Sequence, residues 1–154
     1  IIFLSPVFTY LSEKTASIQN GKIYNFNFTQ FVNDIFRALL ISIRNILVQL
    51  VMVFVIFLIG FVPVLGWGIA IILNLIIVSY FYGFSFLDYT NERNQLSIKE
   101  SVKIVRRKKG LAVGLGLVFY LCFFIPLLGG VISSFLAIIS VVAATISLEE
   151  TFDN

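Results

Sequence analysis

The side chains of this sequence that could do chemistry are mainly basic. Eleven Lys and Arg residues stand against eight Asp and Glu residues. Guanidinium groups bind oxyanions through paired hydrogen bonds, and they also extend along apolar surfaces to reach lipid phosphates. Arginines beside apolar segments are therefore the candidates for binding an anion or a lipid. These candidates are Arg37, Arg44, Arg106 and Arg107.

Enzyme chemistry finds little support in the sequence. The chain contains no His, so it lacks the commonest general base and the commonest metal ligand. Its single cysteine, Cys122, lies in an apolar run and can form neither an internal disulfide nor a thiolate metal cluster. No arrangement of Ser, Lys and carboxylate residues suggests a nucleophile with its base. We therefore expect no catalytic residue, no metal site and no cofactor.

The distribution of charge predicts a multi-pass membrane protein. Hydrophobic residues make up 59% of the chain and charged residues only 12%, whereas an ordinary soluble domain is about 25% charged. Residues 45–87 and 110–148 contain no charged side chain. Each window is longer than the roughly 18 apolar residues that indicate a membrane segment. We therefore expect an all-α integral membrane protein.

Each uncharged window is interrupted near its middle by the same short sequence. The pattern F-[VI]-P-[VL]-L-G occurs at residues 61–66 and again at residues 124–129, 63 positions later. Proline lacks an amide donor and glycine tolerates positive φ, so each copy predicts a break between two helices. The result is two helical hairpins. Their predicted tips are marked by Pro63, Gly66, Pro126 and Gly129.

The lengths of the hairpin arms suggest how deeply the hairpins enter the bilayer. The predicted arms are residues 46–62 and 65–87 in the first hairpin, and residues 111–125 and 127–148 in the second. At about 1.5 Å per residue, the shorter arms reach only about 26 and 22 Å, against a hydrocarbon core of about 30 Å. We therefore expect at least one hairpin to penetrate the bilayer partly, with its tip shielded by protein.

The segments before the first hairpin complete the predicted architecture. Residues 1–14 open on an apolar run without Met, so we interpret them as the end of an upstream helix and the sequence as a fragment lacking the N-terminal part of a long transmembrane helix. Residues 15–28 are expected to be a loop. Residues 29–44 carry their apolar side chains on one stripe, so residues 29–87 comprise an amphipathic helix and the first hairpin. That helix could contact lipid directly or pack on the hairpins. Residues 1–154 are expected to form a single membrane domain.

Residues 88–109 form a basic segment between the hairpins. They hold seven basic and three acidic side chains, a net charge of +4, so the positive-inside rule places them in the cytoplasm. Ser97 and Glu100 have the spacing of a capping box, which predicts a helix over residues 98–109. Its basic face fits contact with anionic lipids, recruitment of an oxyanion, or a protein partner. Nucleic acid is disfavoured because stacking aromatic residues do not interleave with the basic ones.

Several sequence features follow one another in a recognisable order. They are the Arg-bearing amphipathic helix, residues 61–66, the pair Asp88-Tyr89 shortly before a Lys-Glu and Arg-rich helix, residues 124–128, and residues 141–145. This order resembles the CysZ-type sulfate permeases, a family shared with the eukaryotic etoposide-induced membrane proteins. Residues 5–14 also resemble the end of that family's second long helix, so the resemblance spans essentially the whole chain.

The resemblance implies an all-helical inner-membrane protein with two long transmembrane helices, partly inserted hairpins and a homo-oligomeric assembly. It also implies sulfate entry that feeds cysteine biosynthesis. The family's Arg-bearing N-terminal segment, which looks like its sulfate-contacting region, would lie upstream of this sequence, and Ile138 stands where the family often has Pro. We therefore expect a permease for sulfate or a similar oxyanion in the bacterial inner membrane. The alternative is a non-transporting scaffold that organises anionic lipids.

Overall fold

The structure is a computed structural model that describes residues 5–21, 28–63 and 65–152. The described part of the chain is helical and contains no strand, which confirms the all-α prediction. Its helices are α1 (Ser5–Asn20), α2 (Phe28–Ile59), α3 (Gly66–Arg93), α4 (Ile98–Arg107), α5 (Lys109–Phe123) and α6 (Gly129–Phe152).

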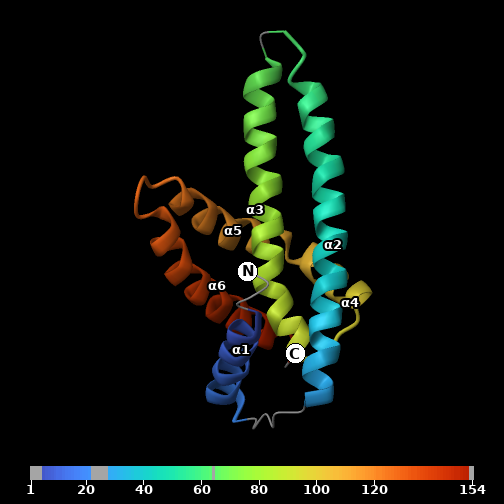
Figure 1. Ribbon diagram of the computed structural model, residues 1–154, viewed down its shortest axis with the longest axis vertical. Helices are drawn as coiled ribbons and strands as arrows, with labels where there is room; N and C mark the ends of the chain where they lie inside the picture. Colours follow the sequence, from blue (N-terminus) through green and yellow to red (C-terminus); the bar gives the residue numbers. More distant parts are fainter. Residues whose placement is uncertain (1–4, 22–27, 64, 153–154) are drawn as a thin grey trace.

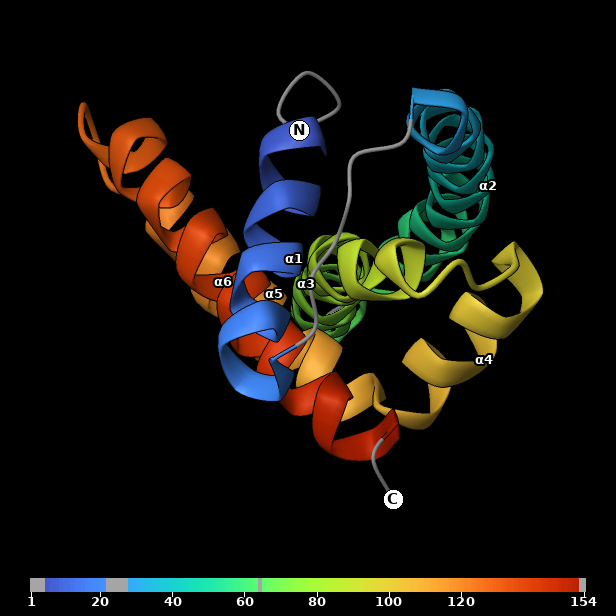
Figure 2. The same ribbon diagram turned by 90° about the horizontal axis from the view of Figure 1, so that it is seen from below.

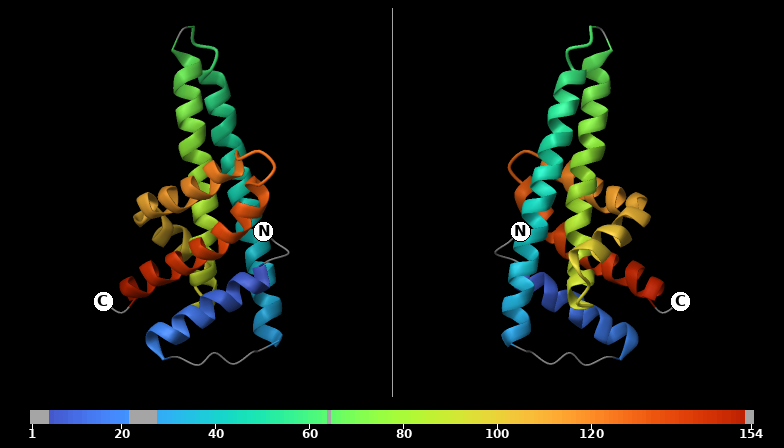
Figure 3. Two further views of the ribbon diagram at one scale, coloured as in Figure 1. Left: turned by 90° about the vertical axis from the view of Figure 1, so that its left-hand side faces the viewer. Right: turned by 90° about the vertical axis from the view of Figure 1, so that its right-hand side faces the viewer.

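The helices form two antiparallel hairpins of different length (Figure 1). The α2–α3 hairpin is the longer, and its tip projects beyond the rest of the molecule, whereas the α5–α6 hairpin packs beside the lower part of α3. Viewed from below, α3 lies between α2 on one side and α1, α5 and α6 on the other (Figure 2). The α1 helix and the α5–α6 hairpin run obliquely to the α2–α3 axis (Figure 3). Helix α3 is therefore the central element of the fold.

The hydrophobic core surrounds the C-terminal half of α3. Phe84, Phe86 and Leu87 are almost completely buried there. Phe86 meets Phe119 of α5 edge to face, with ring centroids 5.3 Å apart, and Phe8 of α1 packs against the same cluster. This end of α3 is thus enclosed by protein, and its polar side chains need partners within the protein.

The distal halves of α2 and α3 expose large apolar side chains. Leu50 is 66% exposed and Trp67 is 77% exposed, and these values fit a surface that faces lipid rather than water. Three helical segments are long and apolar enough to cross a membrane, namely Phe28–Ile59, Gly66–Arg93 and Gly129–Glu149. The chain is therefore a membrane protein.

The sequence predicts an amphipathic helix over residues 29–44 and a separate, short first hairpin arm over residues 46–62. This division is wrong. Residues 28–59 form one continuous helix of 32 residues, about 48 Å long at 1.5 Å per residue. No Pro or Gly interrupts this stretch. The absence of charged residues after Arg44 therefore makes the helix surface apolar but does not end the helix. The first hairpin is consequently long enough to span the bilayer. Helix α5 has only 15 residues, and partial insertion of the second hairpin stays a prediction.

Two further boundaries differ from the sequence-based expectation. Helix α1 continues to Asn20 and is followed by Gly21, whose φ is +67°. The loop expected over 15–28 is therefore wrong for residues 15–20 and for Phe28, where α2 begins, while residues 22–27 lie outside the described part. Helix α3 continues to Arg93. Residues 88–93, which charge counting assigns to the basic segment, are therefore buried at the C-terminal end of α3.

The two hairpin tips share one pattern of backbone hydrogen bonds, as the 63-residue repeat predicts. Leu65 N–H donates to the Pro63 carbonyl and Leu128 N–H to the Pro126 carbonyl, both at 2.8 Å, while Gly66 N–H donates to the Val62 carbonyl at 3.0 Å and Gly129 N–H to the Ile125 carbonyl at 2.8 Å. Each proline lies at a turn that requires no N–H from it. The repeated sequence therefore produces a repeated turn.

The tip glycines are required by close backbone approach. A Cβ atom at Gly129 would lie 2.6 Å from the carbonyl oxygen of Phe123, and one at Gly66 would overlap the carbonyl oxygen of Ile59. Each glycine begins the second arm of its hairpin. The absence of a side chain thus lets the returning arm start directly against the end of the first.

The N-terminus of α4 has the predicted capping box. The Ser97 hydroxyl accepts from the Glu100 N–H at 3.4 Å, and the Ser97 N–H donates to Glu100 Oε2 at 2.9 Å. Helix α4 then ends at Arg107 instead of residue 109, because Lys108 leaves the helical conformation before α5 begins. The short helix is therefore held at a defined starting residue.

The capping box makes the start of α4 sensitive to pH. Hydrogen bonds from the Ser97 hydroxyl and N–H hold the pKa of Glu100 below its ordinary value of 4.5. A carboxyl whose pKa is lower in the folded state stabilises that state above the unfolded pKa, and the contribution is lost as pH falls through the folded pKa. We expect amide exchange in the first turn of α4 to lose protection below about pH 4.5, and Glu100→Gln to remove that pH dependence. Hydrogen exchange measured from pH 6 to pH 3 would show equal profiles for both proteins if the box were unimportant.

Candidate functional site

A buried ion pair joins α2 to the end of α3. Arg37 Nη2 donates to Asp88 Oδ1 at 3.0 Å and Arg37 Nη1 donates to Asp88 Oδ2 at 3.3 Å. Arg37 Nε donates to the Leu96 carbonyl at 2.8 Å, and Glu92 Oε2 lies 3.8 Å from Arg37 Nη1. The guanidinium group is thus matched by two carboxylates and a carbonyl. It is engaged in holding protein elements together.

A second buried pair joins α3 to α1 and α6. Arg93 and Glu149 form an ion pair in which the side chains are 0% and 2% exposed. Arg93 Nη1 also donates to the Ser12 carbonyl at 2.6 Å. Thr145 extends the network, since its hydroxyl lies 3.1 Å from Ser12 Oγ and 3.0 Å from Thr90 Oγ1. These contacts give hydrogen-bond partners to the Arg93 Nη atoms and to the Thr90 hydroxyl at the enclosed end of α3.

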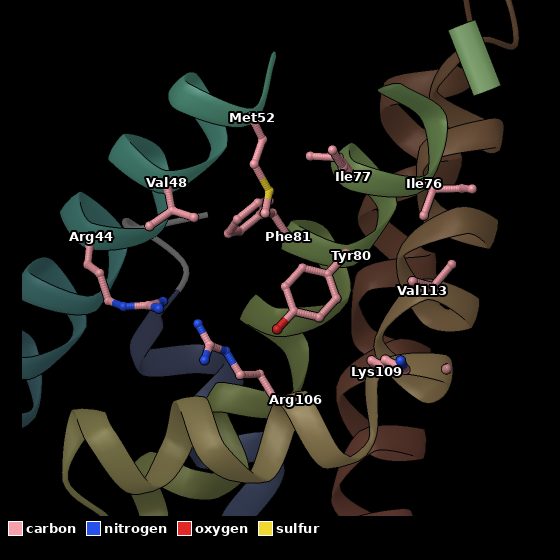
Figure 4. Close-up of a pocket in the computed structure, with 11 residues that line it drawn as sticks. Arg44, Val48, Met52, Ile76, Ile77, Tyr80, Phe81, Arg106, Lys109 and Val113 are labelled. Carbon is pink, nitrogen blue, oxygen red and sulfur yellow. The ribbon is translucent and has the colours of Figure 1, made fainter. Parts of the chain in front are cut away.

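A cationic pocket lies where α2, α3, α4 and α5 meet. Its volume is about 570 Å³. Figure 4 shows the Arg44 and Arg106 guanidinium groups turned toward the same space, with the Tyr80 hydroxyl pointing toward it. The residues that line it are Arg44, Val48, Met52, Ile76, Ile77, Tyr80, Phe81, Arg106, Lys109, Gly110 and Val113. We call this space the cationic pocket.

The positive charge of the cationic pocket is not balanced by its lining. Arg44, Arg106 and Lys109 contribute three cations, and none of the described residues lining the pocket is acidic. Arg44 Nη1 donates to Asn45 Oδ1 at 2.7 Å, which orients the guanidinium group without neutralising it. Arg106 and Lys109 form no ion pair within the described residues. Guanidinium groups that converge beside an apolar wall favour an anion between them.

The structure separates the four arginines that the sequence singles out. Arg44 and Arg106 line the cationic pocket. Arg37 lies apart from it and is paired with Asp88. Arg107 is exposed, as Arg106 is, but it is not among the residues that line the pocket. The tip residues Pro63, Gly66, Pro126 and Gly129 occupy the turns of the hairpins, away from the pocket.

Sequence reasoning missed two residues of the pocket. Lys109 follows Arg106 by three positions within the helix that the sequence predicts over residues 98–109, so the predicted basic face could have included this cation. In the structure Lys109 begins α5 instead. Tyr80 is one of six tyrosines, and nothing in its neighbourhood distinguishes it from the others as a site residue. Only the packing of α3 against α4 brings its hydroxyl toward the arginines.

The fold and the cationic pocket define an all-helical membrane protein that gathers uncompensated positive charge beside its long hairpin. The family model described as "Sulfate transporter CysZ/Etoposide-induced protein 2.4" matches residues 1–145. The chain belongs to this family, which confirms the membership that the sequence features indicate. The protein is thereby a membrane protein of a sulfate-transporter family, which is a family of transporters rather than enzymes.

Proposed function

We propose that the protein is a permease that conducts sulfate or a similar oxyanion across the bacterial inner membrane and supplies sulfate for cysteine biosynthesis. In this proposal the cationic pocket is the anion-binding site on the cytoplasmic side, where the positive-inside rule places the basic segment. The protein works as a homo-oligomer, without a cofactor. The observation that carries the proposal is the convergence of Arg44 and Arg106 in a pocket without an acidic residue.

The chemistry of the pocket suits a tetrahedral oxyanion. Each guanidinium group offers several N–H donors in a fixed plane, the Tyr80 hydroxyl can donate one more hydrogen bond, and Lys109 adds a point charge. Apolar side chains such as Val48 and Ile76 form the remaining wall.

Sulfate uptake by the full-length protein in liposomes tests the function. We expect saturable uptake of radiolabelled sulfate that sulfate analogues inhibit and chloride does not. Hydrogen bonds that involve charged groups each contribute about 1.5 to 3 kcal/mol, so the double variant Arg44→Gln/Arg106→Gln should raise KM at least about tenfold. Flux equal to that of empty liposomes, from a folded preparation, would refute the permease.

Arg107→Gln is the matched control. It removes the same charge from the neighbouring position of the same helix, outside the pocket lining. We expect its KM to stay within about twofold of the wild type, because Arg107 does not line the pocket. Equal losses in Arg106→Gln and Arg107→Gln would show that general positive charge matters and that the pocket does not.

The apolar part of the cationic pocket supports a second candidate function. Met52 and Val48 continue from Arg44 along one face of α2, so the phosphate of an anionic lipid could bind the arginines while its acyl chain lies along that face. In that case the protein would be a lipid-organising scaffold. Native mass spectrometry with phosphatidylglycerol would show adducts that Arg44→Gln/Arg106→Gln removes and Arg107→Gln keeps, in a protein without sulfate flux.

A further inference from the structure

Asp88 contacts the two helices that supply the arginines of the cationic pocket. Its carboxylate accepts hydrogen bonds from Arg37 of α2 and from the Ser101 hydroxyl of α4. Asp88 is only 6% exposed and Ser101 is fully buried. A single carboxylate on α3 therefore bridges α2 and α4, although the pocket does not include it.

The α2 side of this bridge is close to Arg44. Arg37 precedes Arg44 by seven residues, or two helical turns, so both side chains project from nearly the same face of α2 about 10 Å apart along its axis. Arg37 also donates to the Leu96 carbonyl in the connection to α4. The guanidinium group of Arg37 thus fixes both the face that α2 presents and the point at which the chain enters α4.

The α4 side of the bridge includes the only fully buried side chains of that helix. The buried residues of this ten-residue helix are Ser101 and Val105, and Ile98, Val102 and Ile104 are partly buried against the same core. The Ser101 hydroxyl also accepts from Asn91 Nδ2 at 2.9 Å, so the hydroxyl proton is free to be donated to Asp88. Arg106 follows Val105 directly. The docking of Ser101 and Val105 consequently helps to fix the position of the Arg106 guanidinium group.

We propose that Asp88 is a positioning residue whose bridge from Arg37 to Ser101 sets the separation of Arg44 and Arg106 in the cationic pocket. The part that concerns anion affinity rests on the proposed function, whereas the separation of α2 and α4 does not. Asp88 itself would repel an anion. Its burial behind the pocket lets it hold the two cationic helices without facing the ligand.

Spin-label distances between α2 and α4 test the bridge directly. The full-length protein carries Cys122→Ser as background, with labels at exposed positions Leu47 of α2 and Lys103 of α4. We expect a narrow distance distribution in the parent. Ser101→Ala, which removes the hydroxyl without changing charge, should broaden this distribution and shift its mean, and Asp88→Asn should do the same.

Glu92→Gln is the matched control. Glu92 lies one turn after Asp88 on α3, also faces Arg37, and accepts from the Thr9 hydroxyl of α1 at 3.0 Å. These contacts link it to α2 and α1. Glu92→Gln makes the same carboxylate-to-amide change as Asp88→Asn, and the α2–α4 distance should stay unchanged. Ser101→Thr, which retains the hydroxyl, should restore the parent distribution.

Transport adds a second measurement. We expect Ser101→Ala to raise the sulfate KM about threefold to tenfold with a maximal rate within about twofold of the parent, because the site is displaced and not dismantled. An unchanged α2–α4 distance in both Asp88→Asn and Ser101→Ala would overturn the inference. Absence of sulfate flux in the parent would instead refute the proposed function and leave the distance result to decide on the bridge.

Discussion

Replacing Glu149 with Leu will lower the free energy of unfolding by about 3 to 5 kcal/mol, the usual cost of removing one partner from a buried ion pair. The Arg93 side chain is fully buried against Glu149 and Ser12. Leucine fills much of the volume of Glu149 but offers no acceptor, so Arg93 would keep its charge without its carboxylate. Unfolding in mixed detergent micelles, followed by circular dichroism, measures the loss.

The double variant Arg93→Met/Glu149→Leu controls for the change in volume. Replacing both partners by apolar residues removes the uncompensated charge, so the double variant should be more stable than Glu149→Leu alone. The pair would be shown to be energetically unimportant if Glu149→Leu unfolded at the same detergent fraction as the wild type. If the loss of stability in the double variant equalled the sum of the losses in Arg93→Met and Glu149→Leu, the two side chains would not be coupled.

Replacing Gly116 with Ala will separate α5 from α3. A Cβ atom at Gly116 would overlap the Ser79 carbonyl oxygen and lie 2.7 Å from the Gly83 backbone nitrogen. Gly83 has the reciprocal contact, since a Cβ there would overlap the carbonyl of Ala112. Because backbone atoms cannot rotate away, α5 must move as a body. We expect a loss of about 1 to 3 kcal/mol or more, as found when a packed contact is overfilled.

Gly114→Ala provides the matched comparison for this substitution. Gly114 lies two residues earlier on α5, and a Cβ atom there would meet nothing within 4 Å. Alanine is favoured over glycine inside a helix by about 1 kcal/mol, so Gly114→Ala should be neutral or stabilising in the same unfolding measurement. Equal stability of the Gly116→Ala and Gly114→Ala proteins would contradict the close approach of α3 and α5.

The sequence predicts the fold best where a local physical signal acts alone. The two Pro-Gly tips and the Ser97 cap are specified by residues within one turn of each other, and the structure contains them. The boundary near Arg44 has no such signal. Without a Pro or Gly, a helix continues even where its surface changes from partly charged to wholly apolar. Charge counting alone therefore divides α2 at a point where the backbone is continuous.

The site is harder to predict because its members come from four helices. The sequence singles out Arg44 and Arg106, but it cannot show that they face one space while Arg37 is paired with Asp88. That pairing depends on the register of α2 against α3. Gly83 illustrates the same limit, since a glycine within an apolar helix shows its purpose only when a neighbouring backbone is seen to touch it.

The Arg93–Glu149 contact also constrains the order in which the protein can be made. The two residues are 56 positions apart in the chain, and ribosomes add about 5 to 20 residues per second. Arg93 is therefore added to the chain about 3 to 11 s before Glu149. Until Glu149 is added, the end of α3 lacks the carboxylate that pairs with Arg93 in the folded protein. The pair consequently forms only after nearly all of α6 has been synthesised.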